Sequence, residues 1–153
     1  MARNRFSLTT SAEVALVAAT VKTVLQLVSA TNVRLAVSEV TISFDGISNT
    51  AEPVSVQVLR QTTAGTGGSA RNPLKLDDDI ATALQATGLE NIVTTEPTAS
   101  DILATLEVHP QAGVIYQLPI PDGEIVIGSA DRLGLRATAP AAVNCLASMR
   151  GEE

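Results

Sequence analysis

The stretch "VRLAVSEVTISFDG", residues 33–46, carries the clearest folding signal in this chain. Apolar and polar residues alternate along it, which is typical of a β-strand with one buried face. The apolar residues are Val33, Leu35 and Val37, followed one position out of step by Val40, Ile42 and Phe44. A one-residue shift in a period of two predicts a β-bulge near Ser38 and Glu39. Asp45 and Gly46 then favour a turn.

The same alternation recurs through most of the chain. It is found in residues 14–18, 23–27, 54–58, 102–108, 114–118, 133–137 and 143–149. Val, Ile and Thr together supply 42 of the 153 residues, and these branched side chains favour strands. Short connections require antiparallel neighbours. The sequence therefore predicts an all-β protein with an antiparallel β-sandwich, of which the jelly roll is the best-known version.

The pattern also predicts the domain boundaries. Residues 1–11 are polar and basic and are interpreted as an N-terminal arm, and residues 12–150 as one sandwich domain. Residues 62–101 are rich in Gly, Thr and Asp and form a long excursion between strands, in which residues 76–87 are expected to hold a short helix. The last three residues, 151–153, are interpreted as an acidic tail.

The composition excludes several classes of function. The net charge is −6, the ten basic residues are scattered, and aromatic residues make up only 2%, so nucleic-acid binding is not expected. No apolar run is long enough to span a bilayer. Glu13 interrupts the apolar stretch near the N-terminus, so no signal peptide is expected. The single cysteine, Cys145, excludes an internal disulfide.

Two loop motifs resemble known ligand-binding motifs in their amino-acid sequence. "GTGGSA", residues 65–70, matches a dinucleotide fingerprint, but Pro73 follows and no helical period begins there. Asp77–Asp79 could contribute to a cation site together with Glu96 or Asp101, although the spacing of an EF-hand is absent. A mobile loop and a helix cap are the simpler interpretations.

Two residue pairs could in principle support catalysis. Cys145 and His109 could form a nucleophile and a base, but Cys145 falls at an inward position of a predicted strand. Glu107 and Glu124 could form the carboxylate pair of a glycosidase, but sugar sites usually offer aromatic platforms that this chain lacks. We therefore expect no catalytic residue, no cofactor and no metal, and hence no enzymatic activity.

Several positions predicted to point outward are apolar. They are Leu59, Leu103, Ile115, Val126 and Leu146. One exposed apolar residue is ordinary, but five on separate strands suggest that part of the outer surface is covered. Packing against other subunits is the simplest explanation.

Four segments together resemble small structural proteins of tailed-bacteriophage virions, most closely the capsid decoration or cement proteins. The segments are "KTVLQLVSATNVRLAVSEVTISFDG" (22–46), "AEPVSVQVLRQTTAGT" (51–66), "TTEPTASDILATLEVHPQAGVIYQLP" (94–119) and "RLGLRATAPAAVN" (132–144). The resemblance implies a β-sandwich or jelly roll, made in the host cytoplasm, that binds the major capsid protein on the outer capsid surface. It also implies a homo-oligomer, most often a trimer.

On this interpretation, two parts of the chain are candidate capsid contacts. They are the arm, with Arg3, Arg5 and Phe6, and the 62–101 excursion. Leu59, Leu103 and Ile115 are candidate capsid or subunit contacts. The alternative is a receptor- or glycan-binding head of a virion fibre, which would need exposed aromatic loops.

Overall fold

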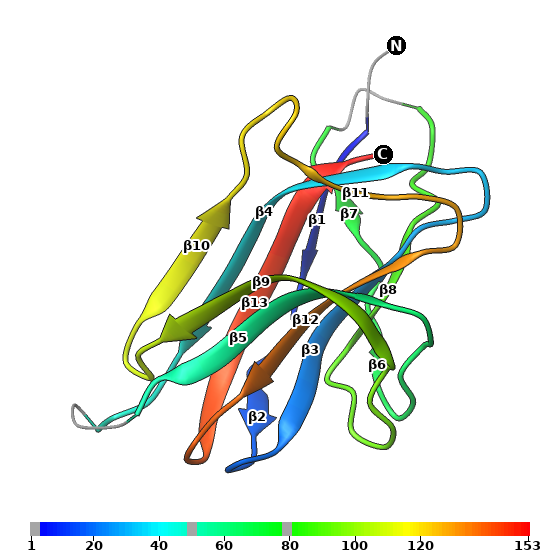
Figure 1. The fold of residues 1–153 in the computed structure, drawn as a ribbon. Coiled ribbons are helices and arrows are strands. Elements are labelled where there is room, and N and C mark those ends of the chain that lie inside the picture. The colour runs from blue at the N-terminus through cyan, green and yellow to red at the C-terminus, as the bar shows by residue number, and fades with distance from the viewer. Residues whose placement is uncertain (1–3, 49–51, 78–80) are drawn as a thin grey trace.

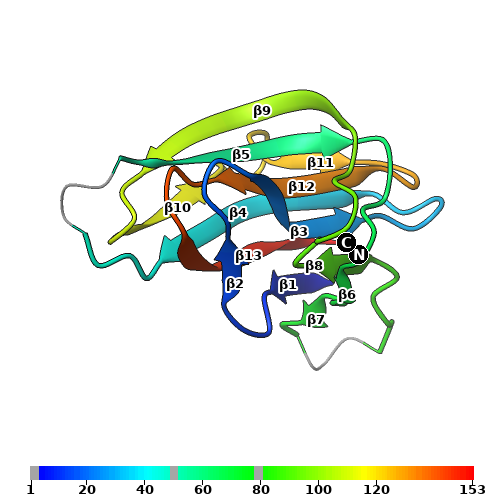
Figure 2. The same cartoon turned by 90° about the horizontal axis from the view of Figure 1, so that it is seen from below.

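A computed structural model describes residues 4–48, 52–77 and 81–153 of the chain. These residues form thirteen β-strands and contain no helix. The strands make two antiparallel sheets that pack face to face (Figure 1), and Figure 2 shows β9, β5 and β12 layered above β4 and β13. The predicted all-β sandwich is confirmed. Its assignment as a jelly roll stays a prediction.

The seven-stranded sheet has the order β10-β4-β13-β1-β7, with β11 also paired to β4 and β2 to β13. Its strands are β1 (Arg5–Thr9), β2 (Val14–Leu16), β4 (Leu35–Phe44), β7 (Leu74–Lys75), β10 (Gly113–Gln117), β11 (Ile125–Ile127) and β13 (Val143–Glu152). The two longest, β4 and β13, lie side by side at its centre.

The six-stranded sheet has the order β6-β8-β3-β12-β5-β9. Its strands are β3 (Val21–Val28), β5 (Val54–Gln61), β6 (Ser69–Ala70), β8 (Thr87–Glu90), β9 (Ala99–Val108) and β12 (Arg132–Thr138). The chain crosses between the sheets repeatedly, for example from β4 to β5 and from β9 to β10. The inward side chains of both sheets form one aliphatic core, as the scarcity of aromatic residues requires.

The predicted β-bulge is confirmed. Along β4 and β13, Glu39 lies opposite Arg150, but Val37 lies opposite Gly151, so Ser38 is the extra residue. The Ser38 carbonyl accepts a hydrogen bond from the Leu118 N–H at 2.8 Å. Gly151 is required at this close approach, since a Cβ there would lie 2.1 Å from the Ala36 carbonyl oxygen.

The predicted arm and acidic tail are wrong for the residues that the structure describes. β1 pairs with β13 on one side and β7 on the other, and Phe6 and Leu8 are buried in the core. At the other end of the chain, β13 continues to Glu152, and Glu153 exchanges backbone hydrogen bonds with Asn4 at 2.9 and 3.1 Å. Both ends are therefore structural parts of the sheet.

The 62–101 excursion is not a free loop, because it contributes strands to both sheets. Its described residues contribute β6, β7, β8 and the start of β9, and no helix is found among residues 76–77 and 81–87. Residues 62–68 and 91–98, here called the cover, hydrogen-bond to each other at Thr62–Thr98 and Thr66–Thr95. They lie over the outer face of β3 and β5, where Ile92 is fully buried.

Beneath the cover lies a buried polar network. The Gln26 amide donates to Gln61 Oε1 at 2.6 Å, and the Gln61 amide donates to Thr23 Oγ1 at 3.1 Å. Thr23 in turn donates to Glu96 Oε2 at 2.6 Å, and Gln26 also binds the Thr63 carbonyl. These hydrogen bonds compensate for the burial of polar side chains, which is costly without partners.

Candidate interaction surface

The outer face of the seven-stranded sheet carries a row of uncharged side chains across four strands. Ile115 of β10 lies opposite Thr41 of β4, Thr41 lies opposite Ser148 of β13, and Ser148 lies opposite Thr9 of β1. The Thr41 and Ser148 hydroxyl oxygens are 2.5 Å apart. Alternation places these side chains outward, because Val40, Ile42, Ala147 and Met149 are in the core.

A second row on this face also contains a large aliphatic residue. Gly113, Ser43 and Leu146 lie opposite one another on β10, β4 and β13. Ile115 is 64% exposed and Leu146 is 45% exposed. We call the outward side chains of these two rows the hydroxyl face. They are Thr9, Thr41, Ser43, Ile115, Leu146 and Ser148.

Charged side chains border the hydroxyl face: Glu13 lines a hollow with Ser43 and Leu146, and Arg150 and Glu39 form a pair. Arg150 lies 3.4 Å from Glu39 in a salt bridge, and the Gln117 amide donates to Glu39 at 3.3 Å. None of the six residues of the hydroxyl face is charged. A partner docking on these six residues would desolvate hydroxyl groups and aliphatic carbon rather than ions, and a low content of charged residues is typical of the centre of a protein–protein interface.

Arg5 is exposed, as its predicted role as a contact requires, but it already has a partner. Its guanidinium donates two hydrogen bonds to the Asp77 carboxylate, at 2.5 and 2.9 Å. These bonds and the opposite charge hold the pKa of Asp77 below its usual value. The ion pair joins β1 to the chain that follows β7, so Arg5 has a structural role before any partner binds.

The other predicted contact residues differ in their outcome. Phe6 and Leu59 are both 0% exposed, so the prediction that they contact capsid or subunits is wrong. Phe6 faces the core from β1, and Leu59 is buried on β5 opposite Gly134. Leu103 is 38% exposed on β9, and Ile115 belongs to the hydroxyl face. Arg3 lies outside the described residues.

A bulge that the sequence pattern did not reveal changes the face of β9. Val58 lies opposite Ala104 but Leu59 lies opposite Ile102, so Leu103 is an extra residue. Ile102 was expected to face inward with Ala104 and is instead 54% exposed. A bulge moves the side chains beyond it to the opposite face, and four alternating residues cannot show where it falls.

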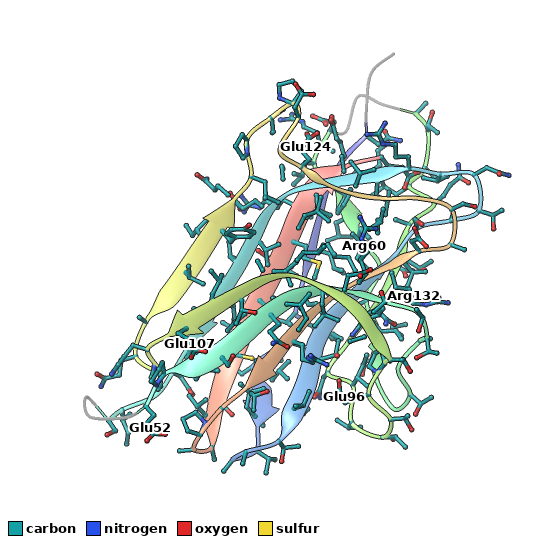
Figure 3. All side chains as sticks on the ribbon, in the orientation of Figure 1. Glu52, Arg60, Glu96, Glu107, Glu124 and Arg132 are labelled. Atoms are coloured by element: carbon teal, nitrogen blue, oxygen red, sulfur yellow. The ribbon has the colours of Figure 1, made fainter. Side chains whose placement is uncertain are left out.

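The residues considered for catalysis are not hydrogen-bonded to one another in the part of the chain that the structure describes. Cys145 is buried in the core, and this burial raises the pKa of its thiol to about 12. His109 Nδ1 accepts a hydrogen bond from the Gln111 N–H within the β9–β10 turn. Glu107 and Glu124 lie in different parts of the molecule, as Figure 3 shows.

The two loop motifs have structural roles in the described residues. Gly65 and Gly68 pack closely on Ile92, and a Cβ at Gly65 would lie 2.3 Å from that side chain. The Glu96 carboxylate accepts hydrogen bonds from the Thr23 N–H and hydroxyl. Asp77 binds Arg5, and Asp78 and Asp79 lie outside the described residues. Within residues 4–48, 52–77 and 81–153, no three His, Cys, Asp or Glu side chains gather as metal ligands.

A groove of about 340 Å³ lies at the end of the sandwich where β4 leads toward β5. Its described lining is mostly aliphatic and includes Ile47, Val54, Pro110, Pro140 and Val143, with Glu52 as a charged residue. None of its described lining residues is aromatic. The groove therefore lacks the stacking surface that sugar recognition usually uses.

Comparison with known proteins does not place the chain in a family. No family model, curated protein or solved structure matches it. Among the described residues, none forms a helix that could cross a membrane.

Proposed function

We propose that this protein is a non-enzymatic structural protein of a tailed-phage virion. In this role it binds the major capsid protein on the outside of the capsid as an oligomer and stabilises the lattice. The observation that carries the proposal is the hydroxyl face, which is uncharged and presents two exposed aliphatic side chains, Ile115 and Leu146. The resemblance of the sequence to decoration proteins supplies the identity of the partner.

The physical basis of the proposed activity is burial rather than chemistry. Covering Ile115 and Leu146 would contribute on the order of 25 cal/mol per Å² of apolar surface, before the entropy of association is subtracted. The hydroxyl groups would exchange hydrogen bonds with water for hydrogen bonds across the interface. Each contact is modest, but repetition over a symmetric capsid adds many of them and resists expansion of the shell.

Sedimentation with undecorated capsids tests the proposal. We expect the wild-type protein to co-sediment with the particles and Leu146→Asp to bind at least tenfold more weakly, because a carboxylate would be desolvated at the interface. Val93→Asp is the matched control, since Val93 is 60% exposed but lies on the cover. Equal binding by the two variants would show that another surface makes the contact.

The stabilising role needs a separate measurement. Particles with and without the protein are heated and diluted into low salt, and release of the genome is followed by nuclease sensitivity. Decorated particles should survive a higher temperature. If both kinds of particle fail together, the protein does not cement the shell. Binding to host cells or glycans with no binding to capsids would favour the alternative of a receptor-binding head.

A further inference from the structure

β10 has a free edge with a regular pattern of hydrogen-bonding groups. In the described residues it pairs only with β4, and it lies at the left margin of the molecule in Figure 1. The Ala112 carbonyl accepts from Phe44 at 3.0 Å, and the Leu118 N–H donates to Ser38 at 2.8 Å. Because bonded residues alternate in an antiparallel ladder, even-numbered residues bond to β4. The backbone groups of Gly113, Ile115 and Gln117 therefore point away from the sheet.

This edge differs from the other sheet edges in lacking protection. β9, at the edge of the six-stranded sheet, is interrupted by register shifts and carries Asp101 and Glu107. The remaining edge strands, β2, β6, β7 and β11, are only two or three residues long. β10 has the sequence "GVIYQ", pairs with β4 without a register shift, and contains neither a charge nor a proline. Bulges, charges and short length are the usual means of preventing edge pairing.

We propose that β10 pairs with β10 of a second copy, antiparallel and about a two-fold axis at Ile115. Ile115 then lies opposite its own copy and Gly113 lies opposite Gln117. The backbone groups of these three residues, which point away from β4, all exchange hydrogen bonds with the second copy. Centring the pair on Val114 or Tyr116 would leave one of the three without a strand partner. The two seven-stranded sheets become one continuous sheet.

The sequence of β10 is self-complementary in this register. Val114 lies opposite Tyr116 on the inner side, and a β-branched residue facing an aromatic ring is a favourable cross-strand pair. Both side chains pack against the core but are only partly buried, so the second copy covers their open side. On the outer side the two Ile115 side chains meet, and no like charges face each other. This complementarity identifies the occupant as a second copy of the chain.

The dimer would place two hydroxyl faces side by side on one surface. A two-fold contact of this kind joins two copies and no more, so it differs from the trimer that the resemblance implies. It does not rest on the proposed function, because the dimer can be measured in the absence of capsids. Capsid binding by Leu146→Asp and dimerisation by Ile115→Asp report on the two proposals separately.

Sedimentation equilibrium over a range of concentrations tests the proposal. The wild-type protein should approach twice the chain mass of 15.8 kDa. Ile115→Asp, which places two carboxylates at the two-fold axis, should dimerise roughly a hundredfold more weakly. Leu146→Asp on the same face and the β-branched Ile115→Thr are the controls, and both should remain dimeric. A monomer at all concentrations, or a trimer that Ile115→Asp leaves intact, would overturn the proposal.

Amide hydrogen exchange distinguishes edge pairing from any other dimer and from misfolding of a variant. In the dimer, the amides of Gly113, Ile115 and Gln117 should be protected, and dilution or Ile115→Asp should remove that protection. The amides of Val114 and Tyr116 bond to β4 and should stay protected throughout. A dimer in which the odd-numbered amides exchange as fast as in the monomer would show that the contact lies elsewhere.

Discussion

Thr23 and Thr41 occupy comparable places, each on the outer face of a sheet, but their surroundings differ. Thr23 is fully buried under the cover, where its hydroxyl accepts from Gln61 and donates to Glu96. Thr41 remains partly exposed on the hydroxyl face and bonds to Ser148. The same side chain therefore belongs to a second interior on one sheet and to an open surface on the other. Substitutions should be tolerated on the hydroxyl face and costly beneath the cover.

The largest difference is expected between two isoleucines. Ile92→Ala should lower the free energy of unfolding by about 2–5 kcal/mol, because Ile92 is 1% exposed and the glycines that contact it cannot fill the space. Ile115→Ala, on the hydroxyl face, should change it by less than about 0.5 kcal/mol. Urea unfolding at low protein concentration measures both. Similar losses for the two variants would contradict the idea that the cover is part of the core.

A glycine beneath the cover sharpens the comparison. Gly134 leaves room for the Gln61 side chain, and a Cβ there would lie 2.4–2.6 Å from the amide group. Gly134→Ala should therefore cost about 3 kcal/mol through overpacking and displaced hydrogen bonds. Gly128→Ala is the control, since its nearest neighbour would be 3.9 Å away. The urea midpoints of the two variants should differ, and the slope of the unfolding free energy with denaturant concentration should be the same.

The two threonines provide the most direct test. Thr23→Val keeps the shape of the side chain but leaves the buried Gln61 amide without its acceptor, at a cost of about 1.5 kcal/mol. Thr41→Val should cost less than about 0.5 kcal/mol, since water can replace the lost partner of Ser148. Thermal unfolding ranks the two variants. If Thr41→Val proves the more destabilising, the polar network contributes less than its burial suggests.

The smallest effect is expected at the border of the seven-stranded sheet, from the exposed ion pair of Arg5 and Asp77. Arg5 holds the pKa of Asp77 below its usual 3.8. The stabilisation from this pair is therefore present above pH 3.8 and is lost as the pH falls through the lower pKa of the folded state. Asp77→Asn should remove that part of the acid sensitivity and leave stability at pH 7 nearly unchanged.

The double variant Asp77→Asn, Arg5→Gln is the control for this effect. It should show the same dependence on pH as Asp77→Asn alone, because either change removes the pair. Unfolding is measured from pH 2 to 7 at low salt, where screening is weakest. If Asp77→Asn loses stability at low pH just as the wild type does, other carboxylates govern acid unfolding. Asp45, which accepts hydrogen bonds from Asn144, is one of them.

Much of the fold could be predicted because alternation is a local property. The strands that became β3, β4, β5, β10, β12 and β13 were predicted from it, as was the bulge at Ser38. Phe6 and Leu8 alternate in the same way, and this signal for β1 was outweighed by the basic residues around it. The Leu103 bulge could not be predicted, because it depends on where β5 fixes the register of β9.

The candidate surface depends on pairing between distant segments. Thr9, Thr41, Ile115 and Ser148 are each ordinary outward residues of a strand, and only the sheet order places them in one row. The sequence also offered Leu59 and Ile115 as equivalent apolar residues. The structure buries the first and exposes the second.

The sequence by itself determined that this protein is built from antiparallel strands with an aliphatic core, because a period of two fixes which side chains face inward. Only the tertiary structure decided which outer face is covered and which is open. Gln26 and Gln61 read as solvent-facing residues, just as Thr41 and Ser148 do. Thr23 alternates with Leu25 and Leu27 and was expected to face inward, but a register shift at Val24 changes its face. The burial of all three results from the return of residues 62–68 and 91–98 across β3 and β5, a long-range contact that no local pattern encodes.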